Sequence, residues 1–197
     1  MAAPVEHDKR QKKILEKALA VFMEEGYEDA TYQKIADKCG ITRTILYLYF
    51  KNKKEIFTYS IKHFLLTIEE HINLIRANNS LSCQEKLTKV IFEIFKLLEQ
   101  NNKLVSVLLE YILYIAKKDI NPATRVRRRV LKLQHIISTI IIDGVKSGEL
   151  KKVNIKKTRD YLYCFIESAI YQLAILKNNN IDELKETVIF AVEKLKA

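Results

Sequence analysis

The chain has 197 residues, of which 48% are hydrophobic, and it contains only four glycines and two prolines. A strand-rich protein needs turn residues between its strands, so this composition favours a nearly all-helical fold. The length suits one or two small domains with a substantial core. The formal net charge of +10 indicates anionic partners.

Three isolated cysteines, Cys39, Cys83 and Cys164, lack the spacing of metal ligands. Each falls on an apolar helix position, which predicts buried free thiols in a reducing compartment. No apolar run approaches the roughly 20 residues that cross a bilayer, and no hydrophobic signal core begins the chain. We therefore expect a cytoplasmic protein that makes no membrane contact.

The first predicted helix covers residues 8–26, and Gly26 marks its end. Its apolar residues recur at helical spacing: Ile14, Leu15, Ala18, Leu19 and Phe22. Four basic residues near its start either contact phosphates or form a solvated helix end, and the sequence leaves both alternatives open: Lys9, Arg10, Lys12 and Lys13.

Two short helical patterns then meet at Gly40. Thr31 and Thr42 are placed to cap the two helices with their side-chain oxygens, and Gly40 supplies the left-handed conformation that ends the first. Leu46 and Phe50, four residues apart, are predicted to pack inward. Basic and aromatic residues are left largely outward, an arrangement typical of a helix-turn-helix.

Within the N-terminal part of the chain, positive charge is concentrated on this motif. Residues 1–56 hold 11 Lys or Arg and 9 Asp or Glu, a net charge of only +2. Residues 31–54 hold six basic residues, with Asp37 as the single acid. This local distribution supports nucleic-acid binding better than the total charge does.

The first 56 residues resemble the DNA-binding region of the tetracycline-repressor (TetR) family of bacterial transcription regulators. Residues at fixed spacings carry the resemblance: Ala18, Phe22, Gly26, Tyr27, Thr31, Ile35, Ala36, Gly40, Ile41, Thr42, Leu46, Tyr47, Tyr49, Phe50, Lys53, Glu55 and Ile56. The chain departs from the family at Thr44 and Ile45, where many members carry Gly-Thr. The resemblance implies a DNA-binding domain at residues 1–52 and a helical effector-binding and dimerisation domain at residues 53–197.

The resemblance also assigns roles within the motif. Positions matching Thr31, Thr42, Tyr47 and Lys53 commonly hold phosphates in that family. The positions expected to reach bases are Tyr32, Arg43, Thr44, Leu48 and Tyr49, and Lys51 adds a further cation. Arginine can bind guanine through two acceptors, while the methyl group of threonine can meet that of thymine. The alternative is that both Tyr47 and Tyr49 are core aromatics.

Six further helices are predicted, at residues 53–76, 85–100, 104–116, 121–148, 158–177 and 181–195. The segment 104–116 is apolar on nearly every side, which predicts a helix buried all round. Polar residues set among the apolar ones are candidates for a largely hydrophobic effector pocket: His63, Glu110, Tyr111 and Tyr114. The alternative is a filled core with Glu110 at the surface.

The last two predicted helices carry more apolar surface than one core needs, which indicates oligomerisation. In the family that the chain resembles, these helices form a four-helix dimer interface. The residues expected there are Leu162, Phe165, Ala169, Leu173, Leu184, Val188 and Val192. Packing within a single chain is the alternative.

Catalytic chemistry has little support. The four histidines lack spaced partners for a metal site, and no nucleophile elbow or glycine-rich phosphate loop occurs. We expect no enzyme activity, no cofactor and no metal. The sequence predicts a homodimeric repressor that binds a palindromic double-stranded DNA operator and responds to a small hydrophobic effector. The alternative is a helical protein-interaction module that keeps the fold without specific DNA binding.

Overall fold

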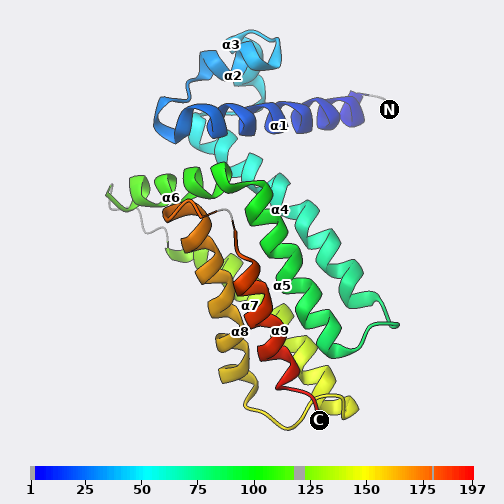
Figure 1. Ribbon diagram of the computed structural model, residues 1–197. Helices are drawn as coiled ribbons and strands as arrows, with labels where there is room; N and C mark the ends of the chain where they lie inside the picture. Colours follow the sequence, from blue (N-terminus) through cyan, green and yellow to red (C-terminus); the bar gives the residue numbers. More distant parts are fainter. Residues whose placement is uncertain (1–2, 118–122, 179) are drawn as a thin grey trace. The chain divides into compact units, whose positions relative to one another are not determined.

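The computed structural model describes residues 3–117, 123–178 and 180–197, and every named element in these ranges is helical (Figure 1). The predicted all-α fold is therefore confirmed. The elements are α1 (Ala3–Asp29), α2 (Tyr32–Cys39), α3 (Arg43–Tyr49), α4 (Lys53–Ala77), α5 (Cys83–Gln100), α6 (Asn102–Lys117), α7 (Ala123–Ser147), α8 (Ile155–Ile170), the π-helical turn η1 (Tyr171–Ile175) and α9 (Asp182–Glu193).

Most predicted helix boundaries lie within three residues of those in the structure. The exception is the helix predicted at 8–26, which extends over Ala3–Asp29 with a kink at Gly26. The helix predicted at 158–177 begins at Ile155 and finishes in η1, where the backbone widens to the π form. The predicted start of another helix at Asn121 and Pro122 lies outside the described residues.

The chain divides into two compact units. The first unit contains the chain up to Glu69 together with Val107–Tyr114, and the second contains Glu70–Ser106 and Ile115–Ala197. Helices α4 and α6 therefore each contribute residues to both units. The predicted division between residues 52 and 53 follows the motif rather than the packing, and it stays a prediction.

Local chemistry shapes the helix-turn-helix of the first unit as predicted. The Thr31 hydroxyl accepts a hydrogen bond from the Lys34 amide (3.2 Å), and the Thr42 hydroxyl accepts one from the Ile45 amide (3.3 Å). Gly40 ends α2 with φ = 68°, in the left-handed region that costs glycine little. These caps satisfy backbone groups that the short helices would otherwise leave open.

Aromatic rings fill the core of the first unit. Phe22 of α1 meets Phe57 of α4 edge to face, with ring centroids 4.8 Å apart. Tyr27, which follows the left-handed Gly26, lies 5.0 Å from Phe57 and 4.5 Å from Tyr111 of α6. Leu46 and Phe50 are fully buried as predicted, which fixes the orientation of α3.

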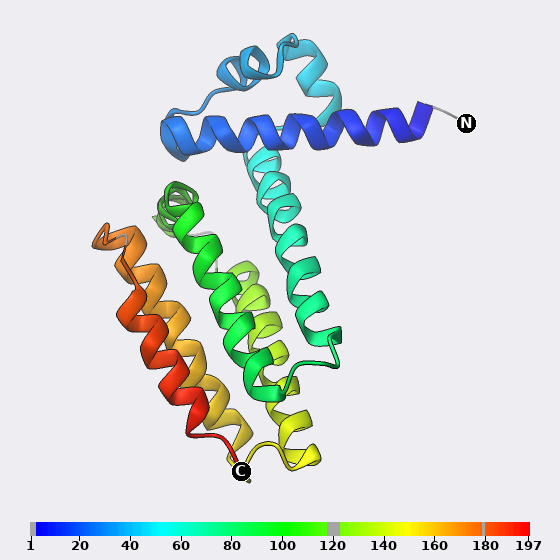
Figure 2. The same ribbon diagram turned by 45° about the vertical axis from the view of Figure 1, so that its right-hand side comes forward.

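In the second unit, α5, α7, α8 and α9 run side by side around an aliphatic core (Figure 2). Ile91 and Phe95 of α5, Ile137 and Ile141 of α7 and Leu162 of α8 are fully buried there. Ser82 and Glu85 form a reciprocal capping box that starts α5.

Two expectations about burial were wrong. Helix α6 is not buried on every side, since Leu113 is 63% exposed and Ala116 and Lys117 are also exposed. Cys83 is buried and Cys39 half-buried, but Cys164 is exposed. Both errors arise because an apolar sequence position does not reveal which neighbour, if any, covers it.

Among the described helices none is long and apolar enough to cross a membrane. The described side chains also contain no group of three or more His, Cys, Asp or Glu residues placed to hold a metal ion.

Candidate functional site

Helix α3 projects polar and apolar side chains away from the core of the first unit. Arg43 and Thr44 are exposed, Tyr47 is 49% exposed and Leu48 is 77% exposed. A leucine this exposed contributes little to the fold, but its methyl groups can contact a thymine methyl. The exposure of Tyr47 excludes the alternative that it is a core aromatic.

The ring of Tyr47 is held from behind by α2. Tyr32 stacks on Tyr47 with ring centroids 4.5 Å apart and an interplanar angle of 15°. The Tyr32 hydroxyl donates a hydrogen bond to the Phe50 carbonyl (2.8 Å), and burial, followed by the nearby Tyr47 and Glu55, raises the pKa of Tyr32 to about 12. Arg43 Nη2 lies 3.4 Å from the Tyr47 hydroxyl, a long hydrogen bond. Tyr32 thus supports the exposed surface from a half-buried position.

Three of the predicted DNA-binding residues lie at or next to helix ends. Thr31 and Thr42 are exposed, and each hydroxyl that caps a helix as an acceptor still has its own hydrogen to donate. Lys51 is exposed, and its backbone amide donates to the Glu55 carboxylate. These three residues can contact phosphates without losing an internal bond of their side chains.

Lys53 has an internal role that the sequence did not reveal. Its amine donates a hydrogen bond to the Glu28 carbonyl (2.7 Å) and lies 4.8 Å from the centre of the Tyr27 ring. Burial lowers the pKa of this half-buried Lys53. Lys53 therefore ties the start of α4 to the turn between α1 and α2.

Ion pairs reduce the positive charge at one edge of the motif. Lys34 and Lys38 of α2 pair with Glu25 and Glu24 of α1. Exposed pairs of this kind stabilise a fold by less than about 1 kcal/mol. Their main effect is electrostatic, because among the described side chains no acid pairs with Arg43, Lys51 or Lys54 around α3.

Similarity to known proteins identifies the family of this chain. Residues 14–59 match the model of the bacterial regulatory proteins of the tetR family, and this segment contains the whole helix-turn-helix. The crystal structure of a TetR transcription regulator from Haloarcula marismortui superposes with a TM-score of 0.85 at 18% identity, covering 96% of this chain and 100% of that one. The chain belongs to the TetR family of transcription regulators.

Two further similarities extend along nearly the whole regulator. The Bacillus subtilis "Fatty acid metabolism regulator protein" is 27% identical over 185 residues, covering 87% of this chain and 91% of that protein. The structure of the regulator FadR from Bacillus subtilis in complex with stearoyl-CoA has a TM-score of 0.68 at 26% identity, covering 94% of this chain and 97% of that one. The predicted DNA-binding regulator is thus confirmed over an interaction module, and this TetR-family chain is not an enzyme.

The Glu110 carboxylate of α6 binds the backbone that leads into the helix-turn-helix of this regulator. Glu110 accepts hydrogen bonds from the backbone amides of Tyr27 (3.2 Å) and Glu28 (3.3 Å). Gly26 makes this approach possible, since a Cβ atom there would lie 3.1 Å from the carboxylate and its φ is +82°. A carboxylate among apolar residues must be paired, protonated or at an opening, and backbone amides pair this one.

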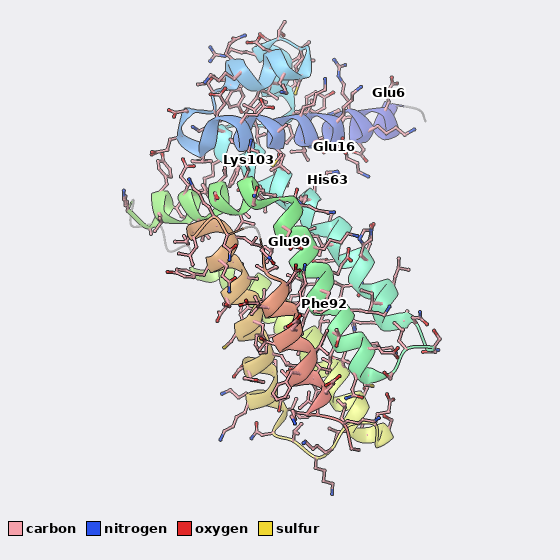
Figure 3. The ribbon with its side chains drawn as sticks, viewed as in Figure 1. Glu6, Glu16, His63, Phe92, Glu99 and Lys103 are labelled. Atoms are coloured by element: carbon pink, nitrogen blue, oxygen red, sulfur yellow. The ribbon has the colours of Figure 1, made fainter. Side chains whose placement is uncertain are left out.

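The other predicted pocket residues have different surroundings. The Tyr111 hydroxyl is buried without a hydrogen-bond partner among the described residues, and the Tyr114 ring lies 5.3 Å from that of Tyr27. The His63 ring points toward Glu16 of α1, with Nε2 3.4 Å from the carboxylate (Figure 3). Two small cavities of about 80 Å³ and 230 Å³ lie in the second unit, and neither is lined by these four residues.

Most of the residues predicted for a dimer interface lie inside the regulator's own second unit. Leu162, Ala169, Leu173, Val188 and Val192 are buried within one chain, and Phe165 and Leu184 are half-buried. The same helices expose a different apolar set on their outer face: Tyr161, Tyr171, Ile175, Leu176, Ile189 and Phe190.

Proposed function

We propose that this regulator is a homodimeric repressor whose α3 reads a partly palindromic operator. The observation that carries the proposal is the exposed set Arg43, Tyr47 and Leu48 on a capped helix. The nearby Lys51 and Lys54 pair with no acid among the described side chains. Arg43 and Leu48 supply contacts to base edges, and Tyr47, Thr31 and Thr42 supply contacts to phosphates. A dimer held across a promoter represses by denying polymerase access.

Selection of genomic fragments by the purified protein tests this proposal. The bound fragments should share two inverted half-sites about one helical turn apart or somewhat further. A Tyr47→Ala/Leu48→Ala double variant, which changes two exposed side chains, is the matched control and should enrich no common site. Equal enrichment by both proteins would contradict a reading role for α3.

The outer face of α8, η1 and α9 is the proposed dimer interface. Tyr161, Tyr171 and Ile175 are spaced to lie on one side of the helix, and Ile189 and Phe190 add apolar surface from α9. Large exposed apolar areas of this kind mark protein interfaces. The residues that the sequence predicted for the interface, such as Leu162 and Val188, pack beneath this face in the core of the second unit.

We further propose a long-chain acyl thioester as the effector. The support is the similarity to a fatty acid metabolism regulator and to FadR, whose structure holds stearoyl-CoA. Within this chain, the Tyr111 hydroxyl, which has no hydrogen-bond partner among the described residues, offers a polar group in an aromatic environment. Neither of the two small cavities is lined by Tyr111 or reaches the 300–1,000 Å³ of a typical ligand pocket. The proposed effector therefore enters beside Tyr111 as α6 moves away from its neighbours.

Glu110 can transmit such a movement of α6 to the helix-turn-helix. Because Glu110 holds the amides of Tyr27 and Glu28, a displacement of α6 shifts the turn that leads into α2 and α3. The effector need only bind the shifted state more tightly than the operator-binding state. Stearoyl-CoA should release the operator in a mobility-shift assay, whereas coenzyme A and stearate alone should not. Release by none of the three would contradict the effector class but not operator binding.

A further inference from the structure

His7 lies in the first turns of α1, before the part of that helix that enters the core. Every side chain from Glu6 to Arg10 is exposed, and burial begins at Ile14. Figure 3 shows Glu6 near the free end of α1. The His7 ring nevertheless has a defined neighbour: it stacks on Tyr49 of α3, with centroids 4.7 Å apart and an interplanar angle of 23°.

The two tyrosines of α3 are therefore each supported by a ring from another helix. Tyr32 of α2 stacks on Tyr47, and His7 of α1 stacks on Tyr49. The supports differ in how they are held. Tyr32 is half-buried and bonded to the Phe50 carbonyl, while no hydrogen bond or ion pair among the described side chains holds His7. The stack on Tyr49 thus connects the first turns of α1 to α3.

We propose that His7 is a positioning residue of the DNA-binding surface, which acts by holding the Tyr49 ring in the orientation that meets the operator. The inference rests on the proposed operator binding and adds a residue from outside the helix-turn-helix. A side chain held in its bound rotamer loses less freedom on binding, so removal of the support weakens the specific complex. Non-specific binding depends on phosphate contacts and should not need the Tyr49 orientation.

Equilibrium binding of wild type, His7→Ala and His7→Phe to the selected operator and to random DNA of equal length tests this role. His7→Ala should lose about three- to tenfold in operator affinity, the range expected for one aromatic pair, and nothing on random DNA. His7→Phe should recover the operator affinity, because a phenyl ring can stack but carries no charge or hydrogen-bonding group. Base preference should relax at the same time in His7→Ala alone.

Gln11→Ala is the matched control, since Gln11 is an uncharged residue on the same stretch of α1 with no described hydrogen bond. It should bind both DNAs like wild type. Equal losses on operator and random DNA for His7→Ala would indicate a phosphate contact and overturn the positioning role. An unchanged His7→Ala, or no recovery in His7→Phe, would overturn it too. Wild-type protein without operator preference would instead overturn the proposed function, and this inference with it.

Discussion

The outward surface of α3 and the outer face of α8, η1 and α9 both expose large apolar or aromatic side chains, but their neighbours differ. On α3, Tyr47 and Leu48 lie within two turns of Arg43 and just before Lys51. On the α8 and η1 part of the outer face, the residues at helical spacing are Tyr161, Cys164, Ser168, Tyr171 and Ile175, none of which is an Asp, Glu, Lys or Arg. On the α9 part, the Lys194 amine lies over the Phe190 ring. Cations beside apolar groups suit a DNA groove, whereas an uncharged aromatic face suits another protein surface. The charges nearby therefore indicate which class of partner an exposed apolar residue serves.

The largest expected effect comes from placing a charge on the uncharged face. Ile175→Asp alters a side chain that is 55% exposed in one chain, so the chain should fold normally. In the dimer it would bury an unpaired carboxylate, which we expect to weaken association by about 2–4 kcal/mol. Sedimentation equilibrium should show folded monomers at micromolar concentration, and operator affinity should fall because only one half-site is bound.

Ala169→Asp is the matched comparison, because Ala169 lies on the same helix but is fully buried within the chain. Its carboxylate would disrupt the core of the second unit and lower the melting temperature. If both variants unfold, the outer face belongs to the core after all. If neither changes the sedimentation of a wild-type dimer, the interface lies elsewhere.

A second prediction separates base recognition by Arg43 from phosphate binding by Lys51 on the α3 surface. Arg43→Ala should cost about 1–3 kcal/mol at one base pair and relax the preference there. Lys51→Ala should weaken binding to all sequences alike and reduce the salt dependence by about one counterion. Lys51 is preferable to Lys53 for this test, because the Lys53 amine also supports the turn at Glu28. Equal losses on operator and random DNA for Arg43→Ala would remove it from the base-reading set.

The helix caps and the Glu110 contact show which interactions can be predicted from the sequence. The caps at Thr31 and Thr42 and the turn at Gly40 were predictable, because each depends on residues three or four positions away. The hydrogen bonds from the Tyr27 and Glu28 amides to Glu110, in contrast, join positions more than 80 residues apart. The sequence could show only that Glu110 stands in an apolar helix, not which groups its carboxylate would meet.

The apolar stripes of α8 and α9 show a different limit. Regular apolar spacing predicted that Leu162 and Val188 would be covered, and they are. The spacing could not show whether these residues are buried by their own chain or by a second chain, because a core and a dimer interface both require apolar side chains. Tyr171 and Phe190 became distinguishable only once the packed helices left them exposed.

A third prediction concerns the contact between Glu110 of α6 and the last residues of α1. Glu110→Gln replaces one of the accepting oxygens by a donor group, which faces backbone amides that are themselves donors. We expect a loss of about 1–2 kcal/mol in stability, visible as a lower melting temperature, and a weaker effect of stearoyl-CoA on operator binding. Glu99→Gln, which removes one acceptor from the ion pair with Lys185, is the control and should retain the full effector response. An unaltered response in Glu110→Gln would contradict coupling through this contact.

The smallest effect is expected for Tyr32→Phe, which keeps the ring under Tyr47 but removes the hydrogen bond to the Phe50 carbonyl. Near neutral pH it should cost about 0.5–1.5 kcal/mol of stability and little operator affinity, since the stack remains. At alkaline pH the order of effects changes. Burial raises the pKa of Tyr32 to about 12, so between pH 10 and pH 12 the unfolded chain releases a proton that the folded chain retains. Stability therefore falls as pH rises through this window, and Tyr32→Phe should lose less than wild type.

Burial also raises the pKa of Tyr27, so the variant should keep part of the alkaline loss. Urea unfolding at pH 7 and at pH 11, monitored by circular dichroism, measures both contributions. Operator binding at neutral pH then decides between the two roles open to Tyr32. A loss as large as that of Arg43→Ala would mean that the hydroxyl meets a base directly, as the sequence predicted. Retained affinity with a smaller alkaline loss would mean that Tyr32 acts as the half-buried support of Tyr47, because only the ring is then needed at the DNA-binding surface.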